Sequence, residues 1–466
     1  MAAARRTKNR SLWPVGLMVG GLLVLVIAGV RLISGDGEAP QEARPGPLES
    51  CDIGGCRANA DLRPARGYEV PSLAVEPEDP DHVVVADVNL VGGICTWHVT
   101  FDGGETWEDG VFDLPEGFKN CQLDSAGFLS AGNVARGPSG TYYYVFSSAR
   151  VGADNLPEEG ESVLVSRSYD GGRSFEPAEV VVPGGSTDVN FVRPSLNVVA
   201  GEGGGDRVLL SFWECDQQRC PRARFAQSLD GGATYSPAIL VSQEPGGNSP
   251  SAPVVDAEGT VHVMFLRRFE DGVTEMVLAR STDGGTSFIN TAVDRQSFLG
   301  RTDDAVQLEV GAAGQALYTV FSDNRQGRPD VFFRSSTDGG DTWGQAVLLS
   351  SLDAQASFLP DISVEPRGRI DVVFYEEVRD DIHNVVWLYS ADRGETFSRR
   401  LQLNDGSIDR KVGYEFEVGD RYGPGVASLP DAALVVWSDS RLGNGLTDTQ
   451  DTAFRRVAVA EAPPSS

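Results

Sequence analysis

The chain has 466 residues, of which 41% are hydrophobic and 23% are charged, so it can form a core and wholesale disorder is not expected. Acidic residues outnumber basic ones by 67 to 39, which gives a formal net charge of −28. A nucleic-acid-binding protein needs a basic face, so this balance argues against that class. With 54 glycines and 26 prolines, the chain is expected to turn often.

The first 33 residues predict a membrane anchor. A basic tip precedes Leu12–Val30, a run of 19 residues without a charge. As a helix, this run nearly spans a hydrocarbon core of about 30 Å. The basic flank should stay in the cytoplasm, so we predict a single-pass cell-membrane protein with an extracytoplasmic C-terminal domain. A cleaved signal peptide is the alternative.

Residues 34–57 are rich in Pro and Gly and predict a flexible tether. We place one domain at residues 58–462, followed by a short tail at 463–466.

All six cysteines lie beyond the anchor and fall as near neighbours: Cys51 with Cys56, Cys95 with Cys121, and Cys215 with Cys220. An even number in an exported chain predicts disulfides, each closing a short loop. Metal binding is the rival interpretation. Because no CxxC occurs and the four histidines are scattered, no metal site is predicted.

A short box with the pattern Ser/Thr-x-Asp-Gly/Arg-Gly-x-Ser/Thr-aromatic recurs six times. Its Asp residues are Asp102, Asp170, Asp230, Asp283, Asp338 and Asp392, spaced by 68, 60, 53, 55 and 54 residues. The box has the chemistry of a hairpin turn, because Asp accepts bonds from the backbone ahead of it and Gly provides positive φ. We interpret the six Asp residues as structural, since six copies cannot all form one active centre.

A second unit recurs around the boxes: a Pro, a strand, a turn and an alternating apolar strand, as in Pro250 to Phe265 and Pro360 to Phe374. Seven such units with short strands predict an all-β protein, a seven-bladed β-propeller, with six blades as the alternative. The last blade would take its fourth strand from residues near Ala58 to Tyr68, which removes an exposed sheet edge.

The boxes resemble the Asp-box, or BNR repeat, of sialidases and related propellers, over roughly residues 68–460. The resemblance implies a sialidase-like propeller. It does not by itself imply sialidase activity, because function resides in sites grafted onto folds.

A sialidase of this kind would use an arginine triad for the sugar carboxylate, a Tyr–Glu nucleophile pair and an Asp acid/base. Its first arginine lies in a Phe/Tyr-Arg-Ile-Pro motif, and Tyr68-Glu69-Val70-Pro71 stands there in this chain. Glu69 would repel a substrate carboxylate where Arg would bind it. Phe191-Val192-Arg193-Pro194 is similar in composition with a shifted register. Arg193 is therefore our candidate for a substrate-facing arginine, with a surface or inter-blade arginine as the alternative.

Carboxylate pairs that could flank a sugar are frequent in this acidic chain: Asp303/Asp304, Glu376/Glu377 and Glu415/Glu417. We retain Glu376, Tyr414 and Glu415 as catalytic candidates, the last two because Tyr414 to Tyr422 could supply a Tyr with a nearby Glu. Glu214, Arg267 and Arg268 attract attention because they end strands and do not repeat.

Two nearly identical clusters, Phe321 to Arg325 and Trp437 to Arg441, indicate repeated structural pairs, Asp323/Arg325 and Asp439/Arg441. The acidic loops that contain them leave calcium open as a ligand, although neither matches an EF-hand, and no other cofactor is predicted.

The leading hypothesis is therefore a module that binds a glycan, a protein or another envelope ligand. The alternative is a glycoside hydrolase, with exo-sialidase as the first guess. The arrangement of side chains at the centre of the propeller should discriminate between them.

Overall fold

The computed structural model describes residues 48–50, 60–62, 68–89, 93–119, 131–154, 156–216, 220–244, 246–269, 273–297, 308–409, 412, 423–443 and 450–459. The chain divides into two units, Met1–Ala43 and Arg44–Ser466, and the described residues all belong to the second. The predicted anchor lies outside them. Within the described part, no helix is long and apolar enough to cross a membrane.

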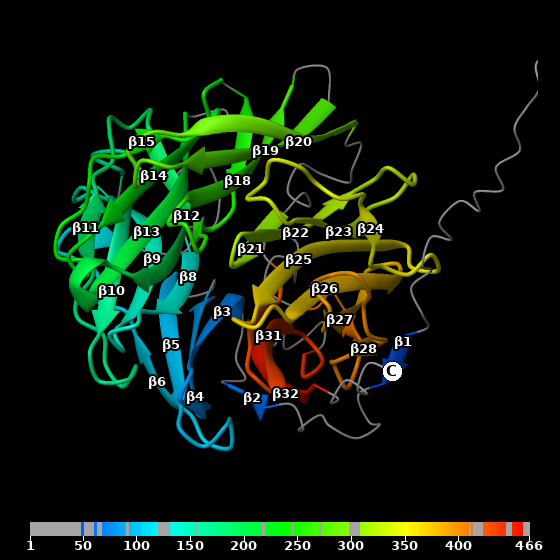
Figure 1. Ribbon diagram of the computed structural model, residues 1–466. Helices are drawn as coiled ribbons and strands as arrows, with labels where there is room; N and C mark the ends of the chain where they lie inside the picture. Colours follow the sequence, from blue (N-terminus) through cyan, green and yellow to red (C-terminus); the bar gives the residue numbers. More distant parts are fainter. Residues whose placement is uncertain are drawn as a thin grey trace, which may run out of the picture. The chain divides into compact units, whose positions relative to one another are not determined.

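The described residues form seven sheets, which are the blades of an all-β propeller (Figure 1). This confirms the predicted fold with seven blades. In blades one and three each strand pairs with the next in antiparallel fashion, whereas the first two strands of blade two both pair with its third strand. Blade one holds β3 (Tyr68–Glu76), β4 (Asp79–Asn89), β5 (Ile94–Thr100) and β6 (Glu108–Val111). Blade two holds β7 (Phe118–Lys119), β8 (Ala131–Arg136), β9 (Tyr142–Arg150), β10 (Ser162–Ser168) and β11 (Glu179–Val182). Blade three holds β12 (Asn190–Ala200), β13 (Asp206–Cys215), β14 (Arg222–Ser228) and β15 (Ile239–Leu240), with a short 3-10 turn, η1 (Glu202–Gly204), between β12 and β13.

The remaining blades follow the same plan. Blade four holds β16 (Gly247–Pro250), β17 (Val254–Val255), β18 (Val261–Arg268), β19 (Val273–Ser281) and β20 (Ile289–Ser297). Blade five holds β21 (Leu308–Ala313), β22 (Ala316–Asp323), β23 (Asp330–Ser336) and β24 (Val347–Leu348). Blade six holds β25 (Ala356–Val364), β26 (Ile370–Arg379), β27 (Ile382–Ser390), β28 (Arg400–Gln402) and β29 (Ile408–Asp409). Blade seven holds β30 (Gly425–Ser428), β31 (Ala432–Asp439) and β32 (Asp451–Ala458).

Two N-terminal strands complete the last two blades. β2 (Ala60–Asp61) pairs with β32 and closes blade seven, as predicted for the segment near Ala58 to Tyr68. β1 (Leu48–Ser50) adds to blade six by pairing in parallel with β28, although the sequence suggests only a tether there. β2 therefore covers part of the edge of β32, at Phe454 and Ala453.

Each Asp box forms a closed turn through its own side chains, and Asp230 illustrates the pattern. Its carboxylate accepts bonds from the Thr234 backbone N–H at 2.9 Å, the Thr234 hydroxyl at 2.6 Å and the Ser228 hydroxyl at 2.7 Å. These bonds favour the charged form and lower the pKa of Asp230 to about 2. Gly231 and Gly232 have φ of +72° and +82°, which a side chain would strain.

The boxes also hold neighbouring blades together. The box aromatic of one blade packs on the preceding blade: Trp107 lies 5.4 Å from Phe454, Phe288 lies 5.2 Å from Phe225, and Phe397 lies 5.0 Å from Phe333, measured between ring centroids. In addition, Arg280 donates to the carbonyl of the box glycine Gly339 at 3.2 Å. The repeated box therefore stabilises the ring of blades as well as its own hairpin.

Candidate ligand-binding site

A cavity of about 510 Å³ lies at the centre of the propeller and is lined by the first strand of every blade. The first strands are β3, β8, β12, β16 with β17, β21, β25 and β30; in blade two β8 takes this place, because the two-residue β7 pairs only with the end of β9. The volume falls within the range of about 300–1,000 Å³ that small-molecule sites occupy in proteins. This cavity is therefore our candidate site.

Polar side chains in the cavity wall bridge the first strands of adjacent blades, which do not pair as a sheet. Ser72 accepts a bond from the Val134 N–H at 3.1 Å, and Asn197 donates to the Pro253 carbonyl at 3.0 Å. Asn133 accepts from the Leu196 N–H at 2.7 Å and donates to the carbonyl of the same residue at 2.9 Å. These bridges satisfy backbone groups that would otherwise be buried unpaired, so the amides and hydroxyls serve the fold first.

Bulges shape the wall at one recurrent position. The pairing of β12 with β13 skips Arg193 and Pro194, and that of β25 with β26 skips Leu359 and Pro360. Proline fits such a position because it has no N–H to donate. Arg193 and Leu359 have φ of +49° and +54°, a left-handed conformation that is strained for residues with side chains.

Arg193 lines the cavity, as its proposed substrate-facing role requires, and no other arginine lies among the described lining residues. Its guanidinium carbon lies 4.7 Å from the ring centroid of Trp213, which also lines the cavity. A guanidinium over an indole is attracted by the negative face of the ring. The pair places a cation and an aromatic surface in the same wall.

Asp361 is a second ionisable group of the wall, and the sequence analysis missed it. Its carboxylate accepts a bond from the Val426 N–H at 2.8 Å and forms no ion pair within the described part of the chain. Burial raises the pKa of Asp361 to about 7, so a proton can be held there near neutral pH. A signal was present: Asp361 follows the recurrent Pro, at a position where other units carry Ser72, Ser195 or Gly425.

The other catalytic candidates are not brought to this cavity. Glu376 is 3% exposed, accepts two contacts from Arg400 at 2.6 and 2.7 Å, and is absent from the cavity lining. Burial raises its pKa, and the Arg400 charge opposes that shift. Tyr414 and Glu415 lie outside the described residues, as do Glu417, Asp303 and Asp304.

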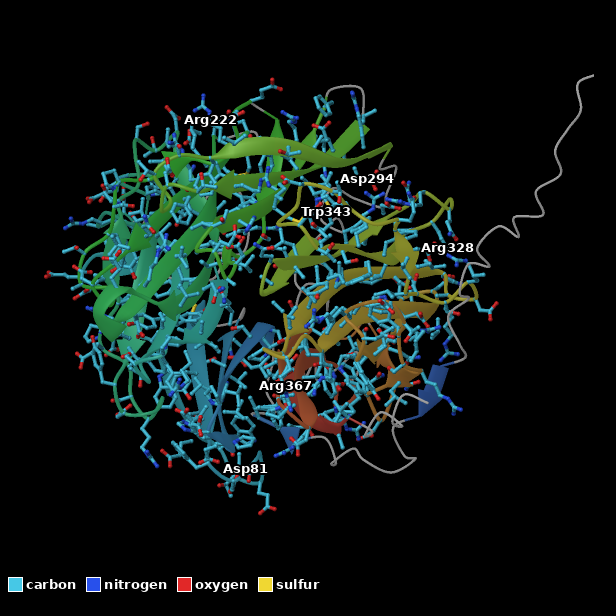
Figure 2. All side chains as sticks on the ribbon, in the orientation of Figure 1. Asp81, Arg222, Asp294, Arg328, Trp343 and Arg367 are labelled. Carbon is cyan, nitrogen blue, oxygen red and sulfur yellow. A yellow bond between two sulfur atoms is a disulfide. The ribbon has the colours of Figure 1, made fainter. Side chains whose placement is uncertain are left out.

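Two of the remaining polar candidates, Glu214 and Arg267, form ion pairs, and Arg222, a partner of Glu214, is labelled in Figure 2. Glu214 pairs with Arg222 at 2.8 Å and with Arg224, and Arg267 pairs with Glu244 at 2.9 Å and with Glu275. Arg268 lies on β18, and Glu69 lies on β3 opposite Val88. None of these residues lines the described cavity wall. Glu214 is next in sequence to Trp213, which does line it.

Both repeated Asp/Arg pairs form, and each reaches a further carboxylate. Arg325 binds Asp323 and also Asp294, the latter at 2.9 Å. Arg441 binds Asp439 and also Asp61 of β2. In the part of the chain that the structure describes, no group of three or more His, Cys, Asp or Glu side chains is arranged to hold a metal ion.

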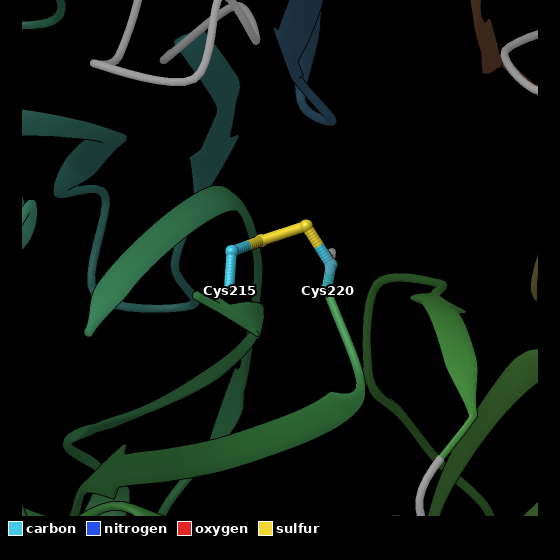
Figure 3. Close-up of a disulfide and its surroundings, with 2 residues drawn as sticks. All are labelled: Cys215 and Cys220. Carbon is cyan, nitrogen blue, oxygen red and sulfur yellow. A yellow bond between two sulfur atoms is a disulfide. The ribbon is translucent and has the colours of Figure 1, made fainter. Parts of the chain in front are cut away.

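One predicted disulfide is confirmed: Cys215 and Cys220 are bonded (Figure 3). Cys95 also belongs to a disulfide. Cys51, Cys56 and Cys121 lie outside the described residues, so their predicted pairing stays a prediction.

Comparison with known proteins gives likenesses among solved structures. No protein-family model matches the chain, and no curated protein does. A Hadza microbial sialidase, Hz136, is 15% identical with a TM-score of 0.47, covering 78% of this chain and 73% of that one. A Dyadobacter fermentans protein of unknown function is 13% identical with a TM-score of 0.49, covering 75% and 97%. A polysaccharide lyase, the ulvan lyase of family PL25, is 12% identical with a TM-score of 0.47, covering 85% and 95%.

Proposed function

We propose that this chain is a membrane-anchored, extracytoplasmic propeller that binds a glycan in its central cavity. The observation that carries the proposal is that Arg193, Trp213 and Asp361 share the wall of one cavity. An aromatic ring offers an apolar face to a sugar ring, while charged groups bind its polar substituents. The charge-free run Leu12–Val30 supports the anchor, and the Asp-box resemblance supports a glycan as the ligand class.

Binding is preferred over hydrolysis because the described wall contains a single arginine where a sialidase would gather three. Moreover, Ser72, Asn133 and Asn197 already bond to the backbone of the next blade. Arg193 and Asp361 are then the groups that discriminate between ligands.

Hydrolysis is the second candidate function. One observation favours it: the pKa of Asp361 is raised to about 7. A general acid must hold its proton near the working pH, and a carboxyl group in a water-poor site does so.

The test is a glycan array probed with the full chain, followed by calorimetry with the glycan that binds. Arg193→Ala should weaken binding about tenfold or more, the effect of removing a hydrogen bond to a charged group. Glu202→Gln, a change of an exposed acid in η1, is the matched control and should bind normally. Binding that Arg193→Ala leaves unchanged, or no binding to any glycan, would reject the proposal.

The same preparations are assayed on fluorogenic exo-glycosides, beginning with an α-sialoside. Turnover that disappears in Asp361→Asn would promote the hydrolase candidate. Turnover that persists in this variant would remove Asp361 from that role.

A further inference from the structure

The Cys215–Cys220 disulfide lies beside the central cavity. Cys215 is the last residue of β13, and Cys220 stands two residues before β14, so the bond closes the connection between these strands. Both cysteines are buried, with exposed fractions of 1% and 6%. Figure 3 shows the bond bridging the two ends of this connection.

The disulfide forms part of a small apolar cluster under Arg193. Val192, Cys215 and Cys220 are its buried members, and Trp213 packs against them. Val192 lies opposite Trp213 in the pairing of β12 with β13, immediately before the bulge that carries Arg193. The disulfide thus contacts both supports of the arginine: the residue before it in the chain and the indole beneath its guanidinium.

Ion pairs between β13 and β14 stabilise the same end of this hairpin. Glu214, between Trp213 and Cys215, is 8% exposed and pairs with Arg222 and Arg224 of β14. The end of β13 is therefore fixed by a covalent bond at one residue and by ion pairs at the next. A left-handed φ at Arg193 persists only where the surroundings determine it, and this cluster provides such surroundings.

We infer that the Cys215–Cys220 disulfide and Trp213 are positioning groups that set the place of the Arg193 guanidinium in the cavity. The inference rests on the proposed function in so far as Arg193 is a ligand contact. It predicts that the ligand site takes its final form only in an oxidising compartment, where such bonds persist.

Arginine-selective labelling with phenylglyoxal, mapped by peptide mass spectrometry on the full chain, tests the inference without a ligand. In Cys215→Ala/Cys220→Ala, the labelling rate of Arg193 should rise about fivefold, because the contact with the indole is weakened. Arg367, whose side chain is 69% exposed and which lies in blade six, is the internal reference. Cys95→Ala removes a different disulfide and is the matched control, with no change expected at Arg193.

A second variant serves if the double cysteine change prevents folding. Trp213→Phe keeps the disulfide and should raise Arg193 labelling to a similar degree. The near-ultraviolet circular dichroism of Trp213, obtained as the difference between the wild type and Trp213→Phe, should be altered in the double cysteine variant. Unchanged Arg193 labelling in both variants, or an unchanged Trp213 signal, would overturn the inference.

The two proposals fail separately. If no glycan binds while Arg193 labelling responds to the cysteine changes, the proposed function is rejected and the positioning role stands. If a glycan binds through Arg193 and the cysteine changes alter neither labelling nor affinity, the positioning role is rejected alone.

Discussion

At the scale of single residues, the cavity wall combines structural bridges with two charged groups of different character. Arg193 lies on a bulge, over an indole ring. Asp361 also acts as a bridge, because it accepts the Val426 N–H as Ser72 of blade one accepts the Val134 N–H. A carboxylate in place of a neutral acceptor carries a desolvation cost, and that cost makes Asp361 sensitive to pH.

The pH dependence of stability should reveal this cost. The pKa of Asp361 is raised from 3.8 to about 7 in the folded chain, so the folded state retains a proton that the unfolded state releases. Stability should therefore fall as pH rises from about 4 to about 7, and then level off. Asp361→Asn keeps an acceptor for Val426 and should be more stable than the wild type at pH 8 by about 1–2 kcal/mol.

Urea unfolding of both proteins across this pH range measures the difference. Equal pH slopes for the wild type and Asp361→Asn would show that Asp361 titrates normally.

The sequence could predict one of these two charged residues. Arg193 stood out because a Phe-Val-Arg-Pro stretch resembles a known motif. Asp361 lies on β25. Whether its side chain reaches the cavity depends on which face of this strand is turned toward the cavity. That face depends on the bulge at Leu359 and Pro360, a backbone irregularity that the sequence pattern does not specify.

At the scale of elements, the Asp-box turn is a joint between blades. The number and spacing of the boxes could be read from the sequence. The hydrogen bonds inside each box could be predicted as well, because they join residues within eight positions of each other. The contact with the preceding blade could not, because it depends on how two sheets pack. The same limit explains why β1 was missed: a three-residue strand has no period to detect.

Two adjacent glycines of the box at Asp338 make it possible to distinguish the cost of straining the turn itself from the cost of disturbing the contact between blades. Gly339 has φ of +66° and open space where a Cβ would stand, whereas a Cβ on Gly340, with φ of +86°, would lie 2.2 Å from a Leu278 methyl carbon of the preceding blade. Gly339→Ala should cost about 1 kcal/mol from backbone strain. Gly340→Ala should cost about 1–3 kcal/mol more, because the neighbouring blade must shift.

Denaturant titration of the two variants gives the comparison directly. If both alanines cost the same free energy of unfolding, the turn does not act as a joint between blades four and five.

At the scale of the whole molecule, the ring closes between blades seven and one. β2 pairs with β32, and Arg456 of β32 reaches Asp81 of blade one at 2.9 Å. Deeper in the same junction, the Thr452 hydroxyl donates to Asp87 at 2.6 Å. Because Asp87 is 1% exposed, its carboxylate needs hydrogen-bond partners such as the Thr452 hydroxyl.

His98 is the titratable partner at this closure, and it gives the propeller a pH dependence of defined sign. Its Nε2 lies 3.2 Å from both Asp87 oxygens. Burial alone would lower the pKa of His98, but the charge and hydrogen bond of Asp87 outweigh it, with Asp109 and Asp451 adding to the rise. A raised folded pKa contributes stability that is present below 6.5 and is lost as pH rises through the folded value.

His262 provides the opposite case within one blade. Burial lowers its pKa despite its bond to Asp256 at 2.8 Å, so it opposes folding as pH falls below 6.5. His98→Gln should therefore remove a stability loss above pH 6.5, and His262→Gln should remove a stability loss below it. Urea unfolding between pH 5 and 8.5 measures both slopes. If His98→Gln and the wild type differ equally at every pH, the junction between blades seven and one does not depend on the charge of His98.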